Sequence, residues 1–158
     1  MSKCCKKQKE IKMEFFELKT AEDIFKKAKA DFEELKKSPT DSYKAFNFFV
    51  TIHHLPEWFD DSIKENATGE REESPILRTV SHLANGAKHF ALDENRHKSV
   101  KKTEREAVYE EGVYEDGVFE DRLMVSLTLK EQKKFGAEKI DVLELGEKAL
   151  NHWSKYFE

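Results

Sequence analysis

The chain has 158 residues, and its 28 Lys and Arg against 32 Asp and Glu give a formal net charge of −4. Charged residues make up 38% of it, where a typical soluble domain has about 25%, and hydrophobic residues make up the same 38%. No apolar run approaches the roughly 20 residues that span a bilayer, and Met1–Lys12 has no apolar region of a secretory signal. With 12 Phe, 4 Tyr and 2 Trp the chain has enough aromatic residues for a core, so we expect one folded domain without membrane association.

The N-terminal segment 1–12 is basic, and we expect it to be a flexible tail that precedes a single domain over 13–158. The two cysteines, Cys4 and Cys5, are adjacent and cannot readily form a disulfide with each other, which favours a reducing, cytoplasmic location. Lipidation or redox sensing at this pair is the alternative. The basic residues of the tail are Lys3, Lys6, Lys7, Lys9 and Lys12.

Two helices are predicted in the first third of the chain. Thr20 is a suitable N-cap, apolar residues recur at helical spacing from Ala21 to Leu35, and Pro39 closes the segment. Thr40 or Asp41 caps a second helix that is apolar nearly all round, which is typical of a central, buried helix. Pro56 is expected to kink or end it.

A third helix is predicted between two polar segments. Asn66–Ser74 is expected to be a loop, and Ser74 followed by Pro75 is a typical helix start. The helix should run to about Phe90 and present a core face, and Asp93–Lys102 should be a polar connection. The predicted core residues are Ile76, Val80, Leu83, Ala87 and Phe90.

The pattern then changes to one typical of strands. Val108–Arg122 contains three copies of a five-residue unit, Val, aromatic, acid, acid and then Gly or Arg. Leu123, Val125, Leu127 and Leu129 alternate with more polar residues, as in a strand with one buried face. We therefore predict a β-hairpin at about 104–130 whose tip carries the repeat.

Asp141 begins the last predicted helix, whose apolar stripe includes Trp153. The expected fold is mainly α: a four-helix bundle with a β-hairpin inserted before the last helix.

The third helix also carries a polar stripe. At about 100° per residue, Arg78, His82, Asn85 and His89 line up almost opposite the predicted core face. The stripe is either a solvated face or a catalytic site for metal-independent cleavage of a ribose phosphodiester. In the second case Arg78 grips phosphate, His89 or His82 transfers protons, and Asn85 orients the substrate. Such a site needs a facing surface, from a homodimer partner or from the hairpin.

Local basic residues are candidates for contacts with phosphate, and Lys88, Lys101 and Lys102 are the candidate binding residues. Charge complementarity within the chain is the favoured interpretation of the basic stretch, because Glu104–Asp121 is strongly acidic. His53 and Glu57 could share a helix face, but no HExxH or repeated ExxH motif is present. We therefore assign no metal ligands and no cofactor.

Two segments resemble a widespread family of small, largely uncharacterised bacterial proteins. They are AFNFFVTIHHLPEW (Ala45–Trp58) and LANGAKHF (Leu83–Phe90), and the resemblance covers about Phe15–Phe157. More distantly, an Arg, an Asn and a His on one bundle helix resemble the HEPN superfamily. Many members of that superfamily are metal-independent ribonucleases or toxins that act as dimers, and others only bind. Thr79 after Arg78 and Ala84 before Asn85 depart from the HEPN motif.

The sequence is therefore compatible with two functions, and it leaves open whether the protein is an enzyme. The favoured one is a cytoplasmic, non-catalytic interaction or regulatory module in a phage-conflict or mobile-element context, and the resemblance suggests a bacterial source. The alternative is a HEPN-like ribonuclease or toxin acting as a dimer. The candidate partners are a second copy of the chain, another protein, and RNA.

Overall fold

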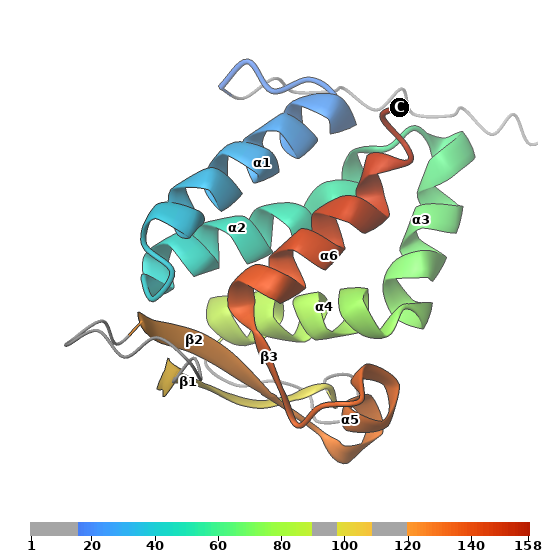
Figure 1. The fold of residues 1–158 in the computed structure, drawn as a ribbon. Helices are drawn as coiled ribbons and strands as arrows, with labels where there is room; N and C mark the ends of the chain where they lie inside the picture. Colours follow the sequence, from blue (N-terminus) through green and yellow to red (C-terminus); the bar gives the residue numbers. More distant parts are fainter. Residues whose placement is uncertain (1–15, 90–97, 109–119) are drawn as a thin grey trace, which may run out of the picture.

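The computed structural model of the protein describes residues 16–89, 98–108 and 120–158. The basic tail, Cys4, Cys5 and residues 109–119 of the repeat lie outside these residues. Within them the chain is mainly helical with a small three-stranded antiparallel sheet (Figure 1). No helix in the described part is both long and apolar enough to cross a membrane. The elements are α1 (Ala21–Lys37), α2 (Ser42–His54), η1 (Leu55–Trp58), α3 (Asp61–Glu73), α4 (Pro75–Lys88), β1 (Val100–Val108), β2 (Glu120–Leu127), α5 (Leu129–Phe135), β3 (Lys139–Asp141) and α6 (Val142–Ser154).

The predicted caps account for where the long helices begin. Thr20 and Asp23 form a reciprocal capping box at the start of α1. The Asp41 carboxylate, rather than Thr40, caps α2 by accepting hydrogen bonds from the Tyr43 and Lys44 backbone N–H groups. Ser74 caps α4 in the same way, with Pro75 at its first position. The four predicted helices are therefore confirmed as α1, α2, α4 and α6.

The loop predicted at Asn66–Ser74 is wrong, because α3 extends through these residues to Glu73. Ala67 is the only buried residue of this helix, so the sequence carries almost no apolar periodicity there. Polar contacts to the C-terminal segment hold α3 instead. Asn66 Nδ2 lies 3.1 Å from Tyr156 Oη, and Glu70 Oε2 lies 2.7 Å from His152 Nε2.

The hairpin prediction is confirmed in its strands and wrong at its ends. β1 and β2 pair antiparallel, with Thr103 opposite Val125, and β3 adds a third strand beside β2. Strand β1 begins at Val100, inside the predicted polar connection. Leu129 lies in α5 with 69% of its surface exposed, and neither α5 nor β3 was predicted.

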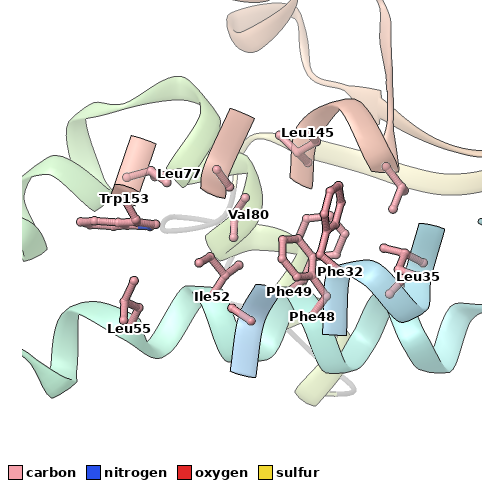
Figure 2. Packing of buried hydrophobic residues seen from close by; sticks show 14 of the residues in the cluster. Phe32, Leu35, Phe48, Phe49, Ile52, Leu55, Leu77, Val80, Leu145 and Trp153 are labelled. Carbon is pink, nitrogen blue, oxygen red and sulfur yellow. The ribbon is translucent and has the colours of Figure 1, made fainter. Parts of the chain in front are cut away.

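The core lies between α1, α2, α4 and α6, and its aromatic centre is the cluster of Phe32, Phe48 and Phe49 (Figure 2). The Phe32 and Phe48 ring centroids are 5.0 Å apart, as are those of Phe48 and Phe49. Trp153 of α6 is 1% exposed, which confirms its predicted place on the apolar stripe.

Helix α4 lies between the other helices and the sheet, which α6 also contacts through β2 and β3 (Figure 1). It packs against α2 and α6 and also against β1 and α5. Of its predicted core residues, Val80 is buried and Ile76 and Leu83 are partly buried against the core, whereas Ala87 is exposed and Phe90 lies outside the described residues. Leu77 and Ala84 are buried although they were not predicted to be, so the core face is rotated from the predicted one. The sheet packs on the side that was expected to face solvent, a partner or the hairpin, so the hairpin is the alternative that the structure shows.

Candidate functional site

Arg78 of the predicted stripe is bound to a buried carboxylate. Its Nε and Nη2 donate to the two Glu131 oxygens at 3.0 and 3.1 Å, and its Nη1 donates to the Glu73 carbonyl at 2.5 Å. Glu131 is 0% exposed and also accepts from Ser99 Oγ at 3.1 Å. This ion pair joins α4 to α5 and to the residue that precedes β1.

His82 joins α4 to the start of β1. Its Nδ1 accepts hydrogen bonds from the backbone N–H groups of Ser99 and Val100, at 3.1 and 2.9 Å. A ring nitrogen that accepts two such bonds carries no proton. Ser99 thus contacts His82 directly and also contacts Glu131, the ion-pair partner of Arg78.

The other two stripe residues lie apart from this group. Asn85 Nδ2 donates to the Ser81 carbonyl of its own helix at 2.9 Å. His89 is the exposed residue that caps the C-terminal end of α4. The structure therefore brings Arg78 and His82 together through Ser99 and Glu131, and no described contact joins Asn85 or His89 to them. The facing surface comes from β1 and α5 of the same chain.

A second polar group lies where α2 meets η1, and we call His54, Glu57, Arg71 and Lys88 the His54 cluster. His54 Nδ1 lies 3.0 Å from Glu57 Oε2, and Lys88 Nζ lies 2.9 Å from His54 Nε2. Arg71 Nη1 lies 3.4 Å from Glu57 Oε1. His54 rather than His53 pairs with Glu57, because residues three apart align where the chain continues as a 3₁₀ turn.

Burial and charge shift two pKa values here. Burial, with the positive charge of Arg71 and the neighbouring His54, lowers the pKa of His53 to about 3. His53 is 7% exposed, and its Nδ1 has no hydrogen-bond partner among the described residues. Burial alone would raise the pKa of Glu57, but hydrogen bonds from His54 and Arg71 outweigh it and lower that pKa. No group of three or more described His, Cys, Asp or Glu side chains is suited to hold a metal ion.

An apolar pocket of about 470 Å³ lies between α2, α4 and β1. Phe46, Phe49 and Leu83 form much of its wall, and Lys101 stands on its β1 side. Of the other predicted binding residues, Lys102 pairs with Glu104 at 2.5 Å, and Lys88 belongs to the His54 cluster. Two small residues near the end of α4, Gly86 and Ala87, also line the pocket.

Comparison with known proteins yields no match: no family model, no curated protein and no solved structure matches the chain.

Three residues of these polar groups were not predicted. Arg71 lies in the segment expected to be a loop, and Ser99 in the expected connection. Glu131 is a single carboxylate between lysines, a pattern that is typical of a solvated helix, so nothing in its neighbourhood indicates burial. The role of Glu131 is evident only from its ion pair with Arg78 in the folded protein.

Proposed function

We propose that the protein is a non-catalytic interaction module that binds an apolar, acid-flanked segment of a partner protein in the pocket between α2, α4 and β1. The observation that carries the proposal is the pocket itself, which is large enough for several side chains and mostly apolar in its lining. None of its lining residues belongs to the Arg78–Glu131 ion pair.

Exposed aromatic residues at the pocket support a protein partner. Tyr43 is 85% exposed and Phe46 is 39% exposed, although both lie on the otherwise apolar helix α2. Large exposed apolar side chains beside a concave surface are typical of binding sites, and aromatic residues supply much of the energy of such contacts. An apolar side chain from a partner would cover both rings.

The charge near the pocket supports an acidic partner. Lys101 is exposed at the edge formed by β1, and no carboxylate lines the pocket. Charge complementarity of this kind accelerates association and excludes partners of like charge. A segment with apolar residues flanked by Asp or Glu therefore matches the site better than a basic one.

The contacts of the polar stripe favour this function over the ribonuclease alternative. An arginine that binds phosphate needs free N–H donors. In Arg78, however, Nε and Nη2 donate to Glu131, and Nη1 donates to backbone carbonyls. A general base needs an accessible ring nitrogen, whereas Nδ1 of His82 accepts two backbone hydrogen bonds. These interactions stabilise the packing of the sheet on α4.

Selection from a phage-displayed peptide library on the immobilised full chain tests the proposal. We expect the selected peptides to carry apolar residues flanked by Asp or Glu. Fluorescence anisotropy with these peptides should show binding at least about tenfold weaker for the Tyr43→Ala/Phe46→Ala variant, and weaker binding for Lys101→Glu.

Leu129→Ala is the matched control, because Leu129 is an exposed apolar residue on α5 that does not line the pocket. This variant should bind the peptides as the wild type does, and circular dichroism should show that all variants remain folded. Failure to select any peptide, or equal affinity of the wild type and the double variant, would refute the proposal.

A further inference from the structure

The contacts of the His54 cluster fix the proton positions on His54. The Lys88 ammonium group can only donate, so His54 Nε2 accepts and Nδ1 carries the proton that is donated to Glu57. A carboxylate that holds the Nδ1 proton orients the imidazole and leaves Nε2 facing Lys88. One ring edge of His54 is thus bound within the protein, while the other lies beside an exposed lysine.

The cluster has more donors than the protein uses. Arg71 donates through Nη1 alone, to the His53 carbonyl and to Glu57, and its Nε and Nη2 have no partner among the described residues. Its side chain is only 18% exposed. Lys88 has three N–H groups, and its one described contact is with His54.

The charge balance of the cluster is positive. Arg71 and Lys88 contribute two positive charges, and Glu57, which contacts Arg71, is the one carboxylate among the described residues that pairs with either of them. The adjoining His53 is neutral, because burial and the same positive charges lower its pKa to about 3. An anion that entered beside Lys88 would balance this excess.

We propose that the His54 cluster binds a phosphate group, with Lys88 and Arg71 donating to its oxygens. The class of ligand is a phosphomonoester or free phosphate, because ammonium and guanidinium groups form charge-assisted hydrogen bonds with phosphate oxygens. The site is distinct from the apolar pocket, because none of its four residues lines that pocket.

Titration of the ¹⁵N-labelled full chain, observed by NMR, tests the proposal with three probes: inorganic phosphate, uridine 5′-monophosphate and sodium acetate. Phosphate should shift the Nε2 resonance of His54 and the amides around Lys88. Lys88→Gln should weaken phosphate binding by about tenfold, because an exposed charge-assisted donor is lost. Tighter binding of the nucleotide than of phosphate would indicate an ester as the ligand, whereas equal binding would indicate free phosphate.

Lys64→Gln is the matched control, because Lys64 is an exposed lysine of α3, the helix that carries Arg71. It removes the same charge without touching the cluster and should bind phosphate as the wild type does. The proposal is refuted if phosphate leaves the His54 resonances unchanged, if acetate binds as tightly as phosphate, or if Lys88→Gln and Lys64→Gln have equal effects. Because Lys88 is exposed, its substitution leaves the fold intact, which the amide spectrum itself verifies.

Discussion

The Arg78 guanidinium and the Glu131 carboxylate form a two-point ion pair in which the carboxylate is entirely buried. A buried carboxylate is stable only while its partner compensates for the lost hydration. The pair thus links α5 to α4 through one arginine, while His82 forms a separate link between α4 and the start of β1.

Arg78→Ala should lower the free energy of unfolding by about 3 kcal/mol, because it leaves the Glu131 charge buried and unpaired. Urea denaturation followed by circular dichroism measures this loss. The double variant Arg78→Met/Glu131→Leu should recover most of the stability, since it removes both charges together. A double variant no more stable than Arg78→Ala would contradict the role assigned to the pair.

Gly146→Ala tests the closest packing between α6 and the aromatic centre of the core. A Cβ at Gly146 would lie 2.6 Å from one Phe32 ring carbon and 2.9 Å from a Phe48 ring carbon. We expect a loss of about 1–3 kcal/mol in the free energy of unfolding, which is typical of overpacking. Urea denaturation of purified protein measures it.

Gly69→Ala is the control for this substitution, since a Cβ there meets no atom within 4 Å and the residue lies in helix α3. It should raise stability by about 0.5–1 kcal/mol, because alanine is the better helix former. If both substitutions change stability in the same direction, the packing of Gly146 is not what constrains that position.

The parts of the fold that were predicted from sequence are those with strong local signals. Thr20, Asp41 and Ser74 mark helix starts through short-range hydrogen bonds, and Trp153 lies on a clear apolar stripe. Helix α3 lacks such a stripe and depends on Glu70, which pairs with residues more than eighty positions away in the chain. A pattern read over a short window cannot detect a contact of that kind.

In the candidate site, too, some residues could be predicted from the sequence and others could not. Sequence periodicity places Arg78 and His82 on one face of α4, and the structure places them together. Periodicity could not indicate that β1 and α5 would supply the opposing groups, because Ser99 and Glu131 lie in segments without a distinctive pattern. The His54 cluster likewise combines residues from α2, η1, α3 and α4.

The buried His53 should make the protein less stable as the pH falls. Its pKa is about 3 when folded, against 6.5 as the ordinary value, so the unfolded chain binds the extra proton between these pH values. The stability that neutral His53 contributes is therefore present above pH 6.5 and lost as the pH falls towards 3, by up to about 1.4 kcal/mol for each pH unit. Urea denaturation between pH 7.5 and 5 measures the slope, above the range in which Glu70 titrates, since the pKa of Glu70 is lowered to about 2.

His53→Leu should flatten this slope, and His89→Leu should not, because His89 is exposed. An unchanged slope in His53→Leu would assign the acid sensitivity to another group. The pair of variants separates the effect of burial from the mere loss of a histidine.

Incubation of the purified protein with labelled, structured RNA in EDTA tests the ribonuclease alternative. We expect no cleavage, because Arg78 binds Glu131, Nδ1 of His82 accepts hydrogen bonds from β1, and His89 has no described contact with either. Gel electrophoresis over several hours provides the measurement. Cleavage that disappears in both His89→Ala and Arg78→Ala would overturn this expectation and restore the stripe as a catalytic site, provided that circular dichroism shows both variants folded. Cleavage that persists equally in both variants would instead identify a contaminating nuclease, because neither predicted catalytic group would then contribute to it.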